Sequence, residues 1–352
     1  MKRTRTKDIS LHEQIQRRVS EKIETKKQDG DFGVVVSTGS TLLDLAISGG
    51  RVRGGGLPLG ILVEIFGPSG CGKTVLLSEI AGNIQRNNGN VIFHDPEARL
   101  NPQFTKLFGL DFDNIDYGTP DLVTQVFKGV REWQPDDKKG SVINGIFADS
   151  LAALSTDLEM DNKEGDKMGM RRAKEFSEEL RKTCRILKQK NYLMVCSNQV
   201  RVNIDAGPYG QKYVSPGGEA VGFYSSLRLR ATKPEKIQNK IRIVGKEIRR
   251  PIGVRVNYEV FKSSVWKPYR VAPVTILFDY GIDDIRENLQ FIKDYTKNTV
   301  YTIGGNKLDM SLEKSIAIVE NDGLEITLKN EVIDLWEDIE DKFSSTRKPK
   351  KR

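Results

Sequence analysis

The stretch IFGPSGCGKTVLL, residues 65–77, decides the fold class of this chain. It matches the pattern G-x-x-x-x-G-K-[ST] from Gly67 to Thr74. The apolar run ILVEIFG precedes the pattern, and apolar residues at helical spacing follow it. A strand, a glycine loop and a helix in this order turn backbone N–H groups toward a phosphate, and the helix dipole adds favourable potential there. The stretch therefore predicts a nucleotide site in an α/β protein, with an ordinary glycine turn before a helix as the alternative.

The residues of this loop have expected parts in binding ATP and Mg²⁺. Lys73 would reach the β- and γ-phosphates, and the Thr74 hydroxyl would ligate Mg²⁺. Cys71 fills a variable position of the pattern, so no chemistry is expected of its thiol. The predicted nucleotide-binding residues are Gly67, Pro68, Ser69, Gly70, Cys71, Gly72, Lys73, Thr74 and Val75.

Composition limits the classes of protein to which the chain can belong. Its 352 residues, 38% of them hydrophobic, suffice for one large core with one or two small appendages. Three scattered cysteines and two histidines predict neither a disulfide framework nor a zinc site, which favours a reducing, cytoplasmic compartment. We expect no signal peptide and no membrane span, because the N-terminus lacks an apolar segment and no stretch reaches about 18 apolar residues. The net charge of +8 weakly favours a polyanionic partner.

Regions of the chain differ in their patterns. Residues 1–33 are polar and basic, with one apolar stripe that predicts a short helix docked on another subunit. In residues 34–281, apolar runs alternate with amphipathic helices, which predicts a mostly parallel sheet. Strands become rare in residues 282–343, where a last amphipathic helix predicts a small α+β domain. Residues 344–352 include the basic run RKPKKR and are expected to be a disordered tail.

Two later strands supply the carboxylates that a phosphate loop needs. The run GIFADS ends an apolar strand in Asp149, which we expect beside Thr74 at the Mg²⁺. The run VIFHDPEARLNP ends another strand close to the γ-phosphate. Its Glu97 is the candidate base that orients the attacking water, whereas Asp95 or His94 could be plain polar groups at a strand end.

A further strand, YLMVCSNQ, ends in Gln199, whose neutral amide suits a sensor of the γ-phosphate. With these features in this order, the chain resembles the RecA recombinases of bacteria and their phages over nearly its whole length. The first and last of the matching segments are more specific than the phosphate loop, because other ATPases lack them. In order, the matching segments are STGSTLLDLAIS, GLPLGILVEIFGPSGCGKT, HDPEARLNP, FADSLAAL, MGMRRAKEFSEELRK, SNQVR and SPGGEAVGFYSSLRLR.

The resemblance implies roles for single residues. Glu97 would be the catalytic glutamate, and Gln199 would be the switch that opens the second DNA-binding loop. Asn101 would read the edge of the adenine, and Phe104 would stack on it. Phe223 would couple the second loop to the neighbouring subunit, with a core strand residue as the alternative.

The resemblance also implies two DNA-binding loops, at about 159–172 and 200–222. Their modest number of cations fits a protein that reads no base sequence and holds the strand through backbone amides and a few charges. The residues expected to contact DNA are Met168, Gly169, Arg171, Arg172, Arg201, Lys212, Gly217 and Gly218.

The chain departs from the family pattern after the second loop. Bacterial relatives carry a Lys-x-Lys pair before a proline, and this pair reaches the ATP of a neighbouring subunit. Here the matching place reads Gly-Lys-Glu, so we expect Lys246, Arg249 or Arg250 to supply that cation. The segment 252–274 is longer than its bacterial counterpart and has no functional account. A basic tail instead of an acidic one favours a diverged, phage-type member.

Together these inferences predict a DNA-dependent ATPase that forms filaments on single-stranded DNA and promotes homologous pairing and strand exchange. ATP and Mg²⁺ are the expected cofactors, and single-stranded DNA, duplex DNA and further copies of the chain are the expected partners. The alternatives are a ring motor with the same core, such as a replicative helicase, and a regulatory ATPase independent of DNA. The segment SPGGEAVGFYSS argues against both.

Overall fold

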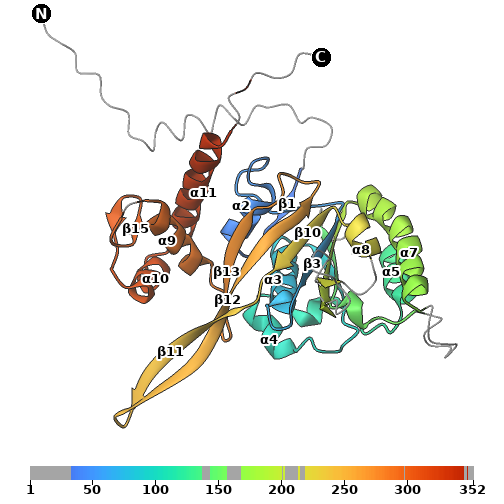
Figure 1. The fold of residues 1–352 in the computed structure, drawn as a ribbon, viewed down its shortest axis with the longest axis horizontal. Helices are drawn as coiled ribbons and strands as arrows, with labels where there is room; N and C mark the ends of the chain where they lie inside the picture. The colour runs from blue at the N-terminus through green and yellow to red at the C-terminus, as the bar shows by residue number, and fades with distance from the viewer. Residues whose placement is uncertain are drawn as a thin grey trace, which may run out of the picture. The chain divides into compact units, whose positions relative to one another are not determined.

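The computed structural model describes most of the chain outside the N-terminal segment. From Val34 onward the chain belongs to one compact unit, built on a ten-stranded sheet (Figure 1). The helix expected within residues 1–33 lies outside the described residues, which include only Gly33 of that segment. The described residues are 33–136, 143–156, 168–199, 201–202, 213–214, 219–296, 298–344 and 347.

The first half of the sheet is parallel and holds the strands predicted from the apolar runs. Neighbouring strands pair in parallel throughout this half. Its central strands are covered on both faces, which explains why their sequences read as continuous apolar runs rather than alternating ones. The strands of this half are β3 (Leu62–Gly67), β4 (Asn90–His94), β5 (Asp116–Gly118), β6 (Asn144–Ala148), β7 (Tyr192–Gln199) and β10 (Leu227–Ala231).

The second half of the sheet is antiparallel, a feature that no sequence pattern predicted. Its strands follow one another through short connections, whereas a parallel pair needs a crossover of about a dozen residues or more. They are β11 (Glu235–Ile243), β12 (Lys246–Ser263), β13 (Val271–Leu277) and β14 (Gly281–Ile282). The whole sheet has the order β14-β13-β12-β10-β3-β7-β6-β4-β5, and β11 pairs with β12 outside this path. The outer part of β11 and β12 projects from the body as a hairpin (Figure 1).

Helices cover the parallel half. The helix α3 (Lys73–Arg86), which follows the phosphate loop as predicted, contacts β3, β4, β6 and β7. The helices α5 (Val123–Glu132) and α7 (Met168–Lys190) contact each other, and their buried residues share one core cluster with β6 and β7. In that cluster the rings of Phe127 and Phe176 meet edge to face. The helix α7 is amphipathic, with Phe176 and Leu180 fully buried on the face toward this cluster.

The C-terminal segment packs against an early helix of the core. The predicted last helix, α11 (Glu325–Lys342), buries Leu328 and Val332 and contacts both α2 (Thr41–Ser48) and α9 (Asp284–Tyr295). Asp284 accepts hydrogen bonds from the backbone N–H and the hydroxyl of Thr41 at 2.7 and 2.6 Å. Among the described helices, none combines the length and the apolar character that crossing a membrane requires. The remaining elements of these regions are β1 (Val35–Val36), β2 (Leu57–Pro58), β15 (Thr302–Ile303), β16 (Asn306–Lys307) and α10 (Leu312–Asn321).

Candidate nucleotide site

The register of the parallel strands brings the predicted catalytic groups to one edge of the sheet. Gly67 at the end of β3 lies opposite Gln199 at the end of β7. Ala148 at the end of β6 lies opposite His94 at the end of β4. The phosphate loop, Asp149 and Gln199 therefore meet at the carboxyl edge, where ligands bind in sheets of this kind.

The phosphate loop has the geometry that its glycines permit. Gly72 precedes α3 with φ of 76°, and a Cβ at this position would lie 2.2 Å from Cδ1 of Ile276. The positive φ favours glycine, and a larger residue would also displace the Ile276 side chain. The N-terminus of α3 follows directly and points into the loop. Lys73 is almost fully buried, and its Nζ donates to the carbonyl oxygens of Gly67 (3.2 Å) and Pro68 (2.8 Å). Phosphate oxygens can replace these two acceptors.

Asp149 is held by hydroxyl groups on both of its oxygens. Thr74 Oγ1 donates to Asp149 Oδ2 at 2.5 Å, and Ser197 Oγ donates to Asp149 Oδ1. A hydroxyl in contact with a carboxylate is a donor set that suits Mg²⁺, because this ion prefers oxygen ligands. Thr74 and Asp149 were predicted from the sequence, whereas Ser197 was not. Ser197 is the first polar residue after the apolar start of YLMVCSNQ, and this position alone does not identify its partner.

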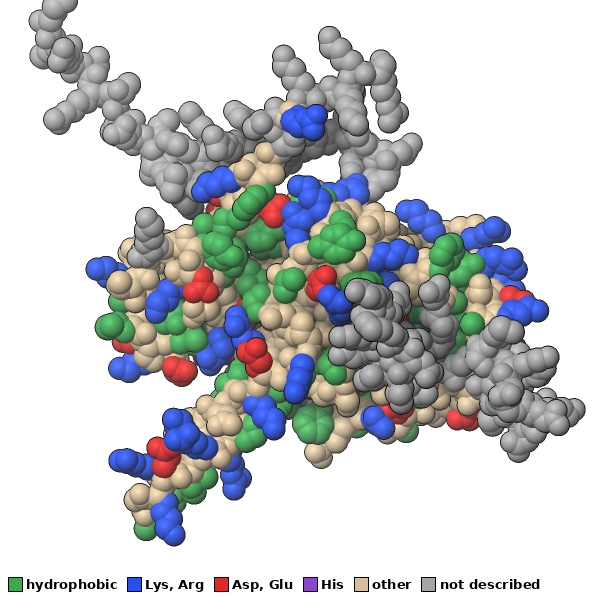
Figure 2. Space-filling model, viewed as in Figure 1, with side chains coloured by type: hydrophobic (Ala, Val, Ile, Leu, Met, Phe, Trp, Pro, Cys, Tyr) green, Lys and Arg blue, Asp and Glu red, His purple; other side chains and the backbone are tan. Residues whose placement is uncertain are grey.

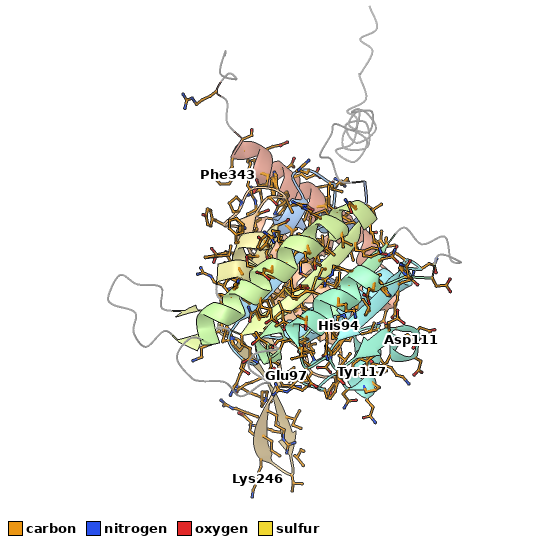
Figure 3. The ribbon with its side chains drawn as sticks, turned by 90° about the vertical axis from the view of Figure 1, so that its right-hand side faces the viewer. His94, Glu97, Asp111, Tyr117, Lys246 and Phe343 are labelled. Carbon is orange, nitrogen blue, oxygen red and sulfur yellow. The ribbon has the colours of Figure 1, made fainter. Side chains whose placement is uncertain are left out.

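Glu97, the candidate base, contacts the residue that follows Asp149. Ser150 Oγ, from the residue after Asp149, donates to Glu97 Oε1 at 3.3 Å. The other oxygen of Glu97 forms an ion pair with Arg99 at 2.5 Å. Because the Arg99 side chain is 73% exposed, this pair holds Glu97 weakly and can open. Figure 3 shows Glu97 at the end of the body from which the hairpin projects, and Lys246 at the tip of the hairpin.

The two other polar residues at the end of β4 have structural surroundings. Asp95 is buried and accepts hydrogen bonds from Leu100 N at 2.7 Å and from Tyr117 Oη at 3.0 Å. Burial, and then the Asp95 carboxylate, raise the pKa of Tyr117 to about 12. Burial lowers the pKa of His94 to about 4, so its imidazole is neutral at physiological pH. Both residues match the alternative interpretation as plain polar groups at a strand end.

The residues expected at the adenine begin the short helix α4 (Pro102–Leu107). Asn101 caps this helix, and its side-chain oxygen accepts from Gln103 N at 2.8 Å. A base edge would therefore be read by the amide donors of Asn101. The ring of Phe104 is 52% exposed, as stacking on a base requires.

A buried polar chain lies behind Gln199. Its neighbour Asn198 donates to Glu64 Oε1 at 3.0 Å, and Arg228 Nε donates to Glu64 Oε2 at 2.5 Å. Glu64 on β3 is fully buried. The chain thus runs from the end of β7 across β3 to β10. It could not be predicted from the sequence, because Glu64 interrupts an apolar run without a recognisable motif.

Phe223 is exposed, so the alternative interpretation of this residue as part of the core is wrong. It belongs to α8 (Glu219–Tyr224), and 74% of its surface is accessible. Lys262 of β12 donates to the carbonyl oxygens of Gly222 (2.9 Å) and Phe223 (2.8 Å). The end of the second expected DNA loop is therefore attached to the antiparallel half of the sheet.

The residues expected to bind DNA are described only in part. Met168, Gly169, Arg171 and Arg172 form the start of α7, without described side chains. Arg201 lies in β8 (Arg201–Val202), which pairs with β9 (Tyr213–Val214). Lys212, Gly217 and Gly218 lie outside the described residues.

The cations expected at a neighbour's ATP lie on the projecting hairpin. Lys246, Arg249 and Arg250 belong to β12, beyond the point where this strand pairs with β10 and β13. Arg249 forms an ion pair with Glu247 at 2.6 Å. The segment 252–274, which lacked a functional account, forms most of β12 and the first part of β13.

One contact of that half reaches the phosphate loop. Tyr258 of β12 is fully buried, and its hydroxyl donates to the carbonyl oxygen of Cys71 at 2.8 Å. The antiparallel half of the sheet therefore contacts the backbone of the phosphate loop through β12. Local sequence patterns do not reveal this role.

A comparison with protein families agrees with this geometry. The family model of the RecA N-terminal domain matches residues 14–283, which include the phosphate loop, both carboxylate strands and the antiparallel half of the sheet. With its mixed α/β fold and this match over more than half of its length, the chain belongs to the RecA family.

Proposed function

We propose that the chain hydrolyses ATP when bound to DNA, forms filaments on single-stranded DNA, and promotes homologous pairing and strand exchange. One structural relationship carries the proposal. Gln199 lies opposite Gly67 of the phosphate loop and directly precedes the segment 200–222. A residue at this position can bind the γ-phosphate and shift the following segment when the phosphate leaves. Nucleotide state and DNA affinity would then be coupled.

The residues at the sheet edge would perform the hydrolysis. Thr74 and Asp149 would hold Mg²⁺, which supplies charge neutralisation on the phosphates when bound. Lys73 would exchange its carbonyl acceptors for phosphate oxygens. Glu97 would orient a water molecule and accept its proton as the oxygen attacks the γ-phosphorus. The bond from phosphorus to the bridging oxygen breaks, and ADP and phosphate leave.

The remaining predicted contacts belong to assembly and to DNA. ATP would lie between adjacent protomers, and residues 1–33 would dock on the next subunit. Single-stranded DNA would lie against the segments 159–172 and 200–222. The exposed Phe223 supports a contact between protomers next to the second segment.

ATPase measurements with and without single-stranded DNA test the proposed chemistry. We expect DNA to stimulate the wild type, and Lys73→Ala to abolish nucleotide binding. Glu97→Gln should still bind ATP and DNA, but should hydrolyse ATP roughly 100-fold more slowly, because the base is lost and the phosphate site is kept. Glu132→Gln removes an exposed carboxylate on α5 and is the matched control. Near-normal turnover in Glu97→Gln would exclude Glu97 from the mechanism.

Electron microscopy with single-stranded DNA and a non-hydrolysable ATP analogue tests the assembly. Helical filaments that require both ligands support the proposal. Closed rings would assign the chain to the motor class, and assemblies with ATPase activity indifferent to DNA would assign it to the regulatory class.

A further inference from the structure

The projecting hairpin concentrates the positive charge of the protein. Residues 235–251, here called the arm, carry a net charge of +4, half of the +8 of the whole chain. Every residue from 238 to 251 is exposed, and Figure 2 shows Lys and Arg side chains along the arm. The basic residues of the arm are Lys236, Lys240, Arg242, Lys246, Arg249 and Arg250.

These cations lie on both faces of the arm. Residues that are directly opposite each other in an antiparallel pair share a face, and successive residues alternate between faces. Lys240 lies opposite Arg249 on one face, and on the other face Lys246 lies opposite Ile243. Arg250 shares the face of Lys246, because these residues are four apart on one strand.

The pairing of Lys240 with Arg249 is unfavourable for the arm alone. Like charges directly opposite each other destabilise a sheet, and a two-stranded hairpin is at best marginally stable in water. On the opposite face, Ile241 and Ile248 form a cross-strand pair that stiffens the hairpin. Glu247 lies on the face of Lys240 and Arg249 and forms an ion pair with Arg249 at 2.6 Å, but with Arg242 this face keeps more cations than carboxylates. A further anion on this face would compensate the remaining charge. The sequence of the arm thus suits a polyanionic surface better than water.

The partner must offer negative charge to both faces at once. A single strand along one face would leave the cations of the other face without phosphates. A groove of duplex DNA has a phosphate backbone on each side, and its major groove, about 12 Å wide, admits a two-stranded ribbon. The nine residues of β11 span about 30 Å, close to one helical turn of duplex.

The arm begins beside the phosphate loop. Ala231, at the end of β10, packs closely on Gly67. A Cβ added to Gly67 would lie 2.8 Å from the Cβ of Ala231. The arm therefore leaves the sheet at the same edge as the segment that follows Gln199. DNA held by the arm would lie on the side of the protein where single-stranded DNA is proposed to bind.

We propose that the arm binds duplex DNA by lying in a groove, with its two cationic faces against the two phosphate backbones. The proposal rests on the proposed function in taking DNA as the polyanion, but it assigns duplex binding to residues outside the segments 159–172 and 200–222. A second copy of the chain is the competing partner of the arm, and the measurements below separate it from duplex DNA.

Fluorescence anisotropy of a labelled duplex, titrated at several salt concentrations without nucleotide, tests the proposal on the full chain. One variant neutralises one face (Lys240→Gln, Arg242→Gln, Arg249→Gln), and a second neutralises the other face (Lys246→Gln, Arg250→Gln). Each phosphate contact contributes about −0.9 to the slope of log affinity against log salt. We expect the slope to be shallower by about 2 to 3 in the first variant and by about 2 in the second. Each variant should also bind duplex roughly tenfold more weakly at low salt.

The matched control removes three exposed cations from helices α5 and α7 (Lys128→Gln, Arg185→Gln, Lys188→Gln) and should keep the wild-type slope. A third arm variant, Val244→Asn, guards against an unfolded arm. Val244 has φ of 48° at the tip, a conformation that asparagine adopts more readily than a β-branched residue. Adding it to either neutralised variant should not restore the slope. Arm variants whose slopes equal that of the control overturn the proposal.

Two further measurements separate this proposal from its competitors. Loss of self-association in sedimentation without DNA, at an unchanged duplex slope, would overturn it and assign the arm to a second copy. If the arm variants lose ATPase activity at saturating single-stranded DNA while their salt slope for duplex stays unchanged, the proposal is also overturned. The arm cations would then contact the ATP of a neighbouring subunit, which is the role predicted from the sequence. A wild type without DNA-stimulated ATPase would refute the proposed function, whereas the duplex slopes would still decide the role of the arm.

Discussion

Glu64 and Arg228 form an ion pair on neighbouring strands, and the carboxylate of this pair is fully buried. Arg228 Nε lies 2.5 Å from Glu64 Oε2, and the two residues are directly opposite each other on β3 and β10. Asn198 occupies the other carboxylate oxygen, and the guanidinium lies over the ring of Phe66 at 4.5 Å. The pair therefore joins the strand that ends in the phosphate loop to the strand that leads into the arm.

Removal of Arg228 alone should strongly destabilise the protein. Arg228→Met leaves a buried carboxylate without its cation, which costs about 3–5 kcal/mol in free energy of unfolding. The double variant with Glu64→Gln should recover most of the loss, because no buried charge remains. Urea denaturation of the two single variants and the double variant measures the coupling. Arg230→Met is the control on the same strand, where the half-exposed pair with Glu259 should contribute about 1 kcal/mol or less. Equal losses in the two arginine variants would contradict a special role for the buried pair.

Ser197 should set the affinity for Mg²⁺ through Asp149. Ser197→Ala frees one oxygen of the carboxylate and lets it rotate away from Thr74, so we expect roughly tenfold more Mg²⁺ for half-maximal ATPase. Maximal turnover at saturating Mg²⁺ should change much less. Ser197→Thr keeps the hydroxyl and should rescue the Mg²⁺ dependence. Ser225→Ala removes another buried hydroxyl, which donates to Val221 O, and is the control. An unaltered Mg²⁺ titration in Ser197→Ala would exclude this positioning role.

Gln199 should couple nucleotide to DNA. We expect Gln199→Ala to bind ATP normally but to lose the difference in single-stranded DNA affinity between the ATP-analogue and ADP states, because the side chain that contacts the γ-phosphate is gone. Fluorescence anisotropy measures the affinity for single-stranded DNA in the ATP-analogue state and in the ADP state, and the ratio of these two affinities reports the coupling. Gln103→Ala on the exposed start of α4 should keep the wild-type ratio. If the Gln199 variant keeps it too, the switch lies elsewhere.

The sequence predicted those parts of the site that depend on local pattern. The phosphate loop, Asp149 and Glu97 each follow an apolar strand directly, and parallel pairing then brings strand ends together whatever the details of packing. Ser197 and Glu64 were missed because a polar residue within a buried strand has no local signature, and its partner is set by tertiary register. Thr41 and Asp284, 243 residues apart, show the same limit.

The antiparallel half was missed for a related reason. Strand direction depends on the length of the connections, and the segment after Ala231 was interpreted from its distance to a proline in a family motif. That comparison could not indicate that Lys246 lies at the tip of a hairpin. The charge pattern of the arm was present in the sequence, but its two faces become distinguishable only when the pairing of β11 with β12 is known.

The buried Glu79 should make the protein less stable as pH rises toward neutrality. Burial raises the pKa of Glu79 to about 7, although its carboxylate accepts a hydrogen bond from Ile282 N at 3.2 Å. Arg86 lowers this pKa and Asp284 raises it, both by smaller amounts. Because the folded-state pKa lies above the ordinary value of 4.5, the contribution of this group to stability is complete below about pH 4.5 and is lost as pH rises through about 7.

Glu79→Gln isolates this contribution, because it keeps the acceptor oxygen and the size of the side chain but cannot ionise. We expect the variant to match the wild type near pH 4 and to exceed its free energy of unfolding at pH 8 by on the order of 1–3 kcal/mol. Urea denaturation across this range gives the difference at each pH, so that other titrating groups, such as the buried Asp44, cancel. Glu132→Gln, at an exposed position, should give a flat difference. A Glu79→Gln difference that does not change with pH would show that Glu79 stays ionised in the folded protein, and that the backbone N–H of Ile282 and Arg86 compensate for its burial.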